Sequence, residues 1–250
     1  MMNQLTQQLK GLKLGGILDT LDVRNREAID RKITYVEFLS LLIQDEIERR
    51  DNARLTRRLR KANFNPQKTL ESFNFDFNPS IDRKQIFDLA SCHYVEKREQ
   101  VWILGESGTG KTHLAQALSF EACKKEMDAL YITVEKMLRD INGGRADGTL
   151  GKRLRKYTSP QLLVLDEFAL KLFKPQEAED FYEVIDHRCE NGATIITSNR
   201  SYEEWPEVFG DSLLASATID RLTYKATKIE ITGPSYRTSR KNKKKSKKTD

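Results

Sequence analysis

The 250-residue sequence predicts an α/β fold in which a small helical module precedes a parallel β-sheet. Short apolar segments alternate with longer helix-like stretches from residue 101 onward, which is the pattern of a parallel sheet with crossover helices. The first 65 residues instead carry apolar residues at three- and four-residue intervals, a spacing that predicts helices. Strands are expected near residues 101–104, 129–134, 161–166, 193–198 and 227–231.

The N-terminal module is expected to span residues 1–64 and to end in a long helix. Leucine and isoleucine residues up to position 21 predict two shorter helices that are interrupted at Gly15-Gly16. Thr34 and Glu37 form a capping box, which marks the start of the long helix. The leucines and isoleucines of the two shorter helices predict either the core of a helical bundle or a docking face for a partner. The apolar residues of the long helix form one stripe, which suits a helix that packs at this end. They are Tyr35, Phe38, Leu39, Leu42, Ile43 and Ile47.

The later part of this helix is strongly basic. Between residues 49 and 61, seven basic residues stand against one acid, Asp51. A cluster of one charge attracts phosphates over a long range and releases counterions on binding. We therefore expect this segment to contact DNA, with a solvated helix face as the alternative. The seven residues are Arg49, Arg50, Arg54, Arg57, Arg58, Arg60 and Lys61.

Two further segments are open to more than one interpretation. Residues 65–78 have the composition of a linker, yet Phe73, Phe75 and Phe77 alternate in it, as in a strand or a base-stacking set. The stretch from Ile141 to Gly148 predicts a glycine-rich turn. Basic residues in and after this turn fit a DNA-facing loop or an exposed charged helix. They are Arg145, Lys152, Arg153, Arg155 and Lys156.

Residues 105–112, GESGTGKT, form a complete G-x-x-x-x-G-K-T phosphate-binding loop between an expected strand and an expected helix. Its glycines allow a tight turn that aims backbone N–H groups at phosphate oxygens, next to the positive end of the helix. Lys111 is expected to reach the β- and γ-phosphates, and the Thr112 hydroxyl to bind Mg²⁺. The loop predicts binding of a nucleoside triphosphate. Its residues are Gly105, Glu106, Ser107, Gly108, Thr109, Gly110, Lys111 and Thr112.

Two later strands are expected to end in polar residues of the same site, because the carboxyl ends of parallel strands open onto the ligand crevice. Asp166 and Glu167 follow one apolar strand. We expect Asp166 to hold the Mg²⁺ with its water shell, and Glu167 to deprotonate the water that attacks the γ-phosphate. Asn199 follows the next strand and is expected to sense the γ-phosphate or hold that water, although Ser-Asn-Arg is also ordinary turn sequence.

The composition of the chain also predicts a basic C-terminal tail and a cytoplasmic location. Residues 237–250 hold eight Lys or Arg and one Asp, a net charge of +7, whereas the whole chain has a net charge of +6. Residues 238–250 are expected to be disordered, with DNA contact and simple solubilisation both open. The three cysteines are far apart and form no metal-binding pattern, as in a cytoplasmic protein. The longest apolar cluster is too short to cross a bilayer, so no membrane partner is expected.

Together these motifs resemble the AAA+ ATPases of the DnaC and IstB group. The resemblance rests on GESGTGKT, LLVLDE, TIITSNR and SATIDRLTYKATKIEITGPSYR. The segment TLESFNFDFNPSIDRKQIFDLA, the phrase GKTHLAQAL and the ending GPSYR are more narrowly similar to IstB-type ATP-binding proteins of bacterial insertion sequences. The likeness runs from about Thr34 to Arg237. It implies an AAA+ P-loop NTPase core over residues 65–237, with the strand order 5-1-4-3-2.

The resemblance also implies roles for single residues. Arg221 is the candidate arginine finger that reaches the γ-phosphate of a neighbouring subunit, with a simple salt bridge as the alternative. Arg237 stands where relatives carry a second sensor arginine, although the helical lid that usually surrounds it has no room here. The linker phenylalanines are implied to pack on the core near the adenine.

The function implied is that of an ATP-dependent, self-assembling, DNA-binding ATPase that assists transposition. It would hydrolyse ATP with Mg²⁺, engage duplex DNA, and recruit or activate the transposase encoded by the same element. Two alternatives stay open. One is a DnaC-type loader of a replicative helicase, and the other is an ATP-switched scaffold on DNA with little turnover. The intact Glu167 argues against the scaffold.

Overall fold

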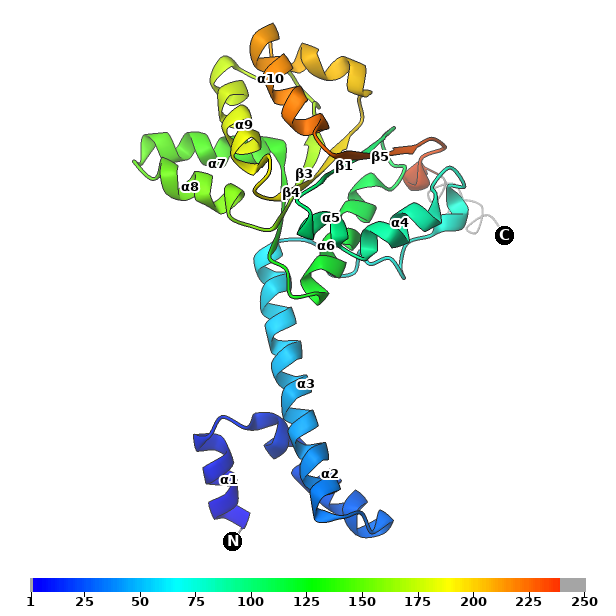
Figure 1. Ribbon diagram of the computed structural model, residues 1–250, viewed down its shortest axis with the longest axis vertical. Helices are drawn as coiled ribbons and strands as arrows, with labels where there is room; N and C mark the ends of the chain where they lie inside the picture. The colour runs from blue at the N-terminus through cyan, green and yellow to red at the C-terminus, as the bar shows by residue number, and fades with distance from the viewer. Residues whose placement is uncertain (1, 239–250) are drawn as a thin grey trace, which may run out of the picture. The chain divides into compact units, whose positions relative to one another are not determined.

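The computed structural model describes residues 2–238 (Figure 1). The chain divides into a first compact unit that ends at Arg57 and a second that begins at Arg58, so the boundary falls inside one long helix. The basic tail expected at residues 238–250 lies, apart from its first residue, outside the described residues. No helix within residues 2–238 is both long enough and apolar enough to cross a membrane.

The first unit is helical, as predicted. It contains α1 (Met2–Gly11), α2 (Gly15–Arg31) and most of α3 (Tyr35–Ala62). The α2 helix starts at the glycine pair because Gly16 N donates to the buried Glu46 Oε2 at 2.6 Å. A Cβ atom on Gly16 would lie 2.7 Å from the Asp45 carbonyl oxygen, so glycine permits this close approach of α2 to α3.

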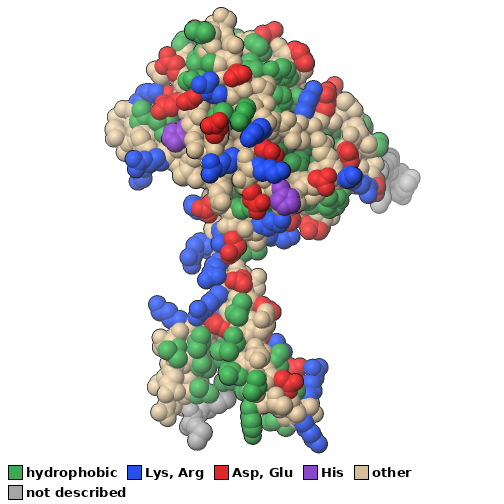
Figure 2. All heavy atoms as spheres, in the orientation of Figure 1, with side chains coloured by type: hydrophobic (Ala, Val, Ile, Leu, Met, Phe, Trp, Pro, Cys, Tyr) green, Lys and Arg blue, Asp and Glu red, His purple; other side chains and the backbone are tan. Residues whose placement is uncertain are grey.

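The long helix α3 begins where the capping box predicts. Thr34 N donates to Glu37 Oε2 at 2.8 Å, and Glu37 N donates back to Thr34 Oγ1 at 3.2 Å. Its apolar stripe is only partly used as core: Leu42 is buried with residues of α1 and α2. The other face of the stripe is exposed, and Figure 2 shows hydrophobic side chains on the surface of this unit. These exposed residues of α3 are Tyr35, Val36, Leu39, Ile43 and Ile47.

The second unit is built on a five-stranded parallel sheet in the order β2-β3-β4-β1-β5. Counted from the other edge, this is the predicted order 5-1-4-3-2, so the fold prediction is confirmed. The central strands β1, β3 and β4 are buried along almost their whole length, as expected for a parallel sheet covered on both faces. The strands are β1 (Gln100–Gly105), β2 (Ala129–Thr133), β3 (Leu162–Phe168), β4 (Ala193–Ser198) and β5 (Ala226–Ile231).

Helices cover both faces of this sheet (Figure 1). On one side lie α4 (Arg83–Ala90), α5 (His93–Glu96) and α6 (Lys111–Lys124). On the other lie α7 (Val134–Ala146), α8 (Leu150–Thr158), α9 (Pro175–Arg188) and α10 (Ser212–Thr223). The described part of this unit also contains two 3₁₀ segments, η1 (Phe75–Phe77) and η2 (Tyr202–Val208). The aromatic core beneath α9 and α10 is centred on Phe168, which stacks on Phe181 with ring centroids 5.0 Å apart.

The predicted glycine-rich turn at Ile141–Gly148 is wrong for most of its length, because α7 continues to Ala146. Gly143 and Gly144 lie inside this helix, where they face α8. A Cβ atom on Gly144 would lie 3.0 Å from the Leu150 Cα, so the glycine allows the two helices to pack closely. The turn itself is confined to the residues around Gly148, whose φ is 71°.

Candidate nucleotide-binding site

The phosphate-binding loop leads from β1 directly into α6. Gly105, Gly108 and Gly110 have φ values of 144°, 87° and 109°, a region that other residues rarely adopt. A Cβ atom on Gly105 would lie 2.2 Å from the Ile231 carbonyl oxygen, so side chains are excluded there by space as well. The loop therefore has the backbone geometry that the motif requires, with the N-terminus of α6 at its end.

Lys111 and Thr112, the first two residues of α6, are held at the mouth of this loop. Lys111 Nζ donates to the carbonyl oxygens of Gly105 and Glu106, at 2.7 and 2.8 Å. Thr112 Oγ1 donates to Asp166 Oδ1 at 3.0 Å. The two side chains predicted to bind Mg²⁺ are thus adjacent, although 54 residues separate them in the sequence.

Asp166 is buried at the end of β3 and accepts two more hydrogen bonds from hydroxyl groups. Tyr131 Oη donates to Asp166 Oδ2 at 2.5 Å, and Thr197 Oγ1 donates to Oδ1. Burial and the hydrogen bond to the negative carboxylate raise the pKa of Tyr131, which keeps its proton on the phenol. Sequence reasoning missed Tyr131 and Thr197. They lie in β2 and β4, the strands on either side of β3, so the rule that located Asp166 extends to them.

Glu167 lines the same pocket as Asp166, although neighbouring residues of a regular strand point to opposite faces. An irregularity in the pairing of β3 with β4, between Leu165 and Phe168, breaks this alternation. Glu167 has a φ of 60°, a conformation that is costly for a residue with a side chain. Its backbone N donates to Thr197 Oγ1 at 3.1 Å, and this hydrogen bond holds the irregular segment of β3, a backbone bulge, in place. The strained backbone brings both carboxylates to one site.

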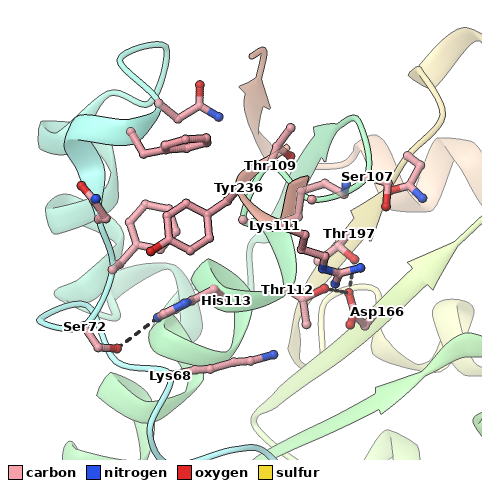
Figure 3. Close-up of a pocket in the computed structure, with 18 of the residues that line it drawn as sticks. Lys68, Ser72, Ser107, Thr109, Lys111, Thr112, His113, Asp166, Thr197 and Tyr236 are labelled. Atoms are coloured by element: carbon pink, nitrogen blue, oxygen red, sulfur yellow. Dashed lines mark hydrogen bonds between the residues drawn. The ribbon is translucent and has the colours of Figure 1, made fainter. Parts of the chain in front are cut away.

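The site encloses a cavity of about 400 Å³, within the size range of small-ligand pockets (Figure 3). Ser107 to Thr112, both carboxylates, Asn199 and Arg237 line it, as predicted for a common site. Gly105 and Glu106 line a neighbouring hollow instead, which they share with Asn199.

Aromatic side chains form one wall of the cavity. Phe73 packs edge-to-face on His113, with ring centroids 5.1 Å apart, and Phe77 packs edge-to-face on Tyr236 at 4.9 Å. Tyr236 N donates to the Gly108 carbonyl oxygen at 3.0 Å, which ties the GPSYR segment to the phosphate-binding loop. The strand considered for the phenylalanines is wrong, because residues 75–77 form a 3₁₀ turn capped by the Asn74 side chain.

Arg221 does not line this pocket in its own chain. Its guanidinium pairs with Asp186 of α9 and lies 4.9 Å from the centroid of the Tyr182 ring. The salt bridge considered as an alternative is therefore present within one chain. Both partners remain partly exposed, and the role of Arg221 in a neighbouring site stays a prediction.

Most of the basic residues proposed to contact DNA already have acidic partners. In α3, Arg49 and Arg50 both pair with Glu46, at 3.1 and 2.6 Å. Arg54, Arg58 and Lys61 pair with Asp51, Glu126 and Asp128 respectively. The pairs of Arg54 and Lys61 are exposed and contribute little to stability, so these side chains can exchange partners when a phosphate approaches. Glu46 is buried, so Arg49 and Arg50 are held more firmly.

The second basic group is held more firmly. Arg145 pairs with Asp180, a buried carboxylate, and Arg153 pairs with Asp140 and Asp147. These two arginines thus connect α7, α8, α9 and the turn between α7 and α8. Within residues 2–238, Lys152 forms no such ion pair. Arg155 is exposed and also forms no ion pair within the described residues, so Lys152 and Arg155 are better placed than Arg153 to reach DNA.

Titration of Lys111 should make nucleotide binding depend on pH. Burial lowers the pKa of Lys111 to about 8, an effect that Asp166 opposes and Arg237 adds to. Bound phosphate favours the ammonium form, so binding above this pKa requires uptake of a proton. We expect the Kd of a non-hydrolysable ATP analogue to be flat below about pH 8 and to rise by up to about tenfold per pH unit above it.

The matched control for this titration is Lys111→Arg, because a guanidinium stays charged throughout the range. This variant is expected to flatten the profile just above pH 8, whatever its absolute affinity. Isothermal titration calorimetry in buffers of different ionisation enthalpy would count the protons taken up. An equally steep rise in the arginine variant would assign the dependence to another group.

Fold and site together define a P-loop nucleoside triphosphate-binding protein of the AAA+ class: a parallel sheet of this strand order, a phosphate-binding loop after β1 and a carboxylate pair at the end of β3. Comparison with known proteins gives the family. The chain belongs to the IstB-like ATP binding protein family, whose profile matches residues 7–246.

Two relatives illustrate the match. One, from Mycobacterium tuberculosis, is named as an ATP-binding protein in an insertion sequence, and it is 41% identical over 93% of this chain and 93% of its own length. The other is named as the ATP-binding protein of insertion sequence IS21 from Pseudomonas aeruginosa. It is 34% identical over 97% of this chain and 91% of its own length.

Solved structures support the fold alone. A DnaC helicase loader superposes with a TM-score of 0.53 at 21% identity, over 60% of this chain and 87% of that chain. AMPPCP-bound DnaA from Aquifex aeolicus superposes with a TM-score of 0.54 at 24% identity, over 69% of this chain and 53% of that chain.

Proposed function

We propose that this protein is a Mg²⁺-dependent ATPase that assembles with its own copies on duplex DNA and recruits or activates the transposase of the same insertion sequence. The observation that carries the ATPase assignment is the convergence of Lys111, Thr112, Asp166 and Glu167 on one cavity. The role in transposition is supported by family membership and by relatives that are named for insertion sequences.

The side-chain oxygens of Thr112 and Asp166 are suitable ligands for Mg²⁺. Mg²⁺ in phosphate-transfer sites is held by one or two protein oxygens together with phosphate oxygens and water. Thr112 Oγ1 and Asp166 Oδ1, 3.0 Å apart, would supply the protein's share. When bound, the ion neutralises charge that develops on the phosphates.

The remaining residues would position and activate water. Lys111 would release the loop carbonyls and bind the β- and γ-phosphate oxygens. Glu167 would accept a proton from the attacking water, and the Asn199 amide would hold that water against the γ-phosphate. Arg237 lines the same cavity and would act as the second sensor.

Assembly would complete the site. An arginine finger stabilises the charge of the transition state, and Arg221 does not line the cavity of its own chain. A second copy of the chain would supply it in trans, so nucleotide binding and self-assembly would be coupled. The basic residues of α3 and α8 would hold the assembly on DNA through phosphate contacts, which carry little sequence information.

The test offers both candidate partners on immobilised duplex DNA. The protein, with a non-hydrolysable ATP analogue, is mixed with the transposase encoded beside it and with the host replicative helicase. We expect retention of the transposase, only when protein and analogue are both present, and stimulation of ATP hydrolysis by the transposase. Lys111→Ala, which weakens nucleotide binding, is the control that should retain neither. Retention of the helicase alone, with hydrolysis indifferent to the transposase, would reassign the protein as a helicase loader.

A further inference from the structure

The segment between α3 and η1 brings a lysine, Lys68, to the nucleotide cavity that the phosphate-binding motif does not include. Three contacts fix this segment to α6, the helix that follows the loop. Asn65 N donates to Gln116 Oε1 at 2.9 Å, and His113 Nε2 donates to the Thr69 carbonyl oxygen at 3.0 Å. Ser72 Oγ lies 3.2 Å from the same imidazole nitrogen (Figure 3). The backbone at Lys68 is therefore held in place relative to Lys111 and Thr112.

The Lys68 side chain points into the cavity. Figure 3 shows it extended beside α6 with its ammonium group directed to the region of Thr112 and Asp166. The side chain is half-buried, and burial lowers the pKa of this ammonium while the Asp166 carboxylate opposes the effect. Its head group thus lies in a partly dehydrated place and senses the charge at the predicted metal site.

Within residues 2–238, the Lys68 ammonium has neither a hydrogen bond nor an ion pair. The hydrogen bonds of the Asp166 carboxylate come from Thr112, Tyr131 and Thr197, and none comes from Lys68. Other lysines near the surface of this unit, such as Lys61 and Lys156, do reach a carboxylate. A half-buried cation without a protein partner is costly, and an anionic ligand offsets that cost.

The position of the Lys68 ammonium indicates which phosphate group of the nucleotide it would contact. The base is expected against the aromatic wall of Phe73, Phe77 and Tyr236, whereas the end of the triphosphate is expected at Thr112 and Asp166. Lys68 lies at this second end. We propose that Lys68 binds the γ-phosphate of ATP through its ammonium group and so makes the protein discriminate between ATP and ADP.

This inference rests on the proposed ATP chemistry of the site and adds a residue supplied by the linker. It is tested by binding alone, with a non-hydrolysable ATP analogue and with ADP, each with Mg²⁺. For Lys68→Met we expect about a 10- to 100-fold loss of affinity for the analogue, the value of a hydrogen bond between charged groups. The affinity for ADP should change by less than about threefold, because ADP has no γ-phosphate.

Two further variants distinguish an effect of the lost positive charge from an effect on folding. Lys68→Arg keeps the charge and is expected to retain most of the preference for the analogue. Lys84→Met makes the same change at an exposed lysine of α4, outside the cavity, and should leave both affinities unchanged. Equal losses for both nucleotides in Lys68→Met, or no loss for either, would overturn the proposal.

The outcome is independent of the transposition assignment. Normal recruitment of the transposase with no selective effect of Lys68→Met would refute only the role of Lys68. Conversely, selective loss of the ATP analogue in a protein that never engages the transposase would support Lys68 and refute the proposed partner.

Discussion

Glu167→Gln is expected to lower the rate of ATP hydrolysis by about 100- to 10,000-fold, the usual contribution of a general base. The amide has the size of the carboxylate but cannot accept a proton from water. The backbone bulge should persist, because the hydrogen bond to Thr197 Oγ1 comes from the backbone N of residue 167. ATP affinity should therefore stay within about threefold of the wild-type value, and the ATP-bound assembly should accumulate.

Steady-state phosphate release and equilibrium binding of ATP separate these two effects. The matched control is Glu96→Gln, which makes the same change at an exposed glutamate of α5, outside the nucleotide cavity. Its hydrolysis rate should be close to wild type. If Glu167→Gln hydrolyses ATP as fast as the wild type, another group activates the water, and Glu167 has no catalytic role.

Arg221→Ala is expected to lower hydrolysis by about 1,000-fold or more in the assembled protein, as removal of arginine fingers does elsewhere. Binding of ATP to the single chain should be unaffected, since Arg221 is absent from its own cavity. Mixing this variant with Lys111→Ala should restore part of the activity, because each chain then contributes one intact half of a shared site. Hydrolysis measured across mixing ratios gives the test.

The salt bridge to Asp186 supplies the control. Asp186→Asn breaks this pair and leaves the guanidinium in place. If Arg221 acts on a neighbour, Asp186→Asn should hydrolyse ATP at nearly the wild-type rate, because the lost pair is partly exposed and of small energetic value. If Arg221 serves only its own chain, both variants should behave alike, and mixing with Lys111→Ala should restore nothing.

The phosphate-binding loop was predictable because each of its residue types answers a local demand. Gly105, Gly108 and Gly110 occupy backbone conformations that only glycine adopts easily, and these conformations are encoded within eight residues. The same reasoning was wrong at Gly143 and Gly144. A glycine serves equally for a turn or for close packing of helices, and the choice depends on α8, which the local pattern does not reveal.

The residues missed by sequence reasoning owe their place to contacts between distant segments. Tyr131 belongs to no motif and gains its role only because β2 pairs with β3 and places its hydroxyl on Asp166. Lys68 stands in a polar stretch of ordinary linker composition, and its place in the site depends on the attachment of that stretch to α6. Spacing along the chain carries no signal for such residues. Strand order and register locate Tyr131, whereas the contacts of the linker with α6 locate Lys68.

The aromatic wall has a consequence for the cohesion of the second unit. Phe77 and Tyr236 come from opposite ends of this unit's sequence, and they meet over the loop that follows β1. A nucleotide bound there would contact Phe77, Tyr236 and the phosphate-binding loop together, and so would hold these distant parts of the chain in place. By mass action, ATP at about one hundred times its Kd adds about 2.7 kcal/mol to the free energy of unfolding. Without ATP this stabilisation is absent, so we expect proteases to cleave the chain near Phe77 and Tyr236 more readily than in the nucleotide-bound protein.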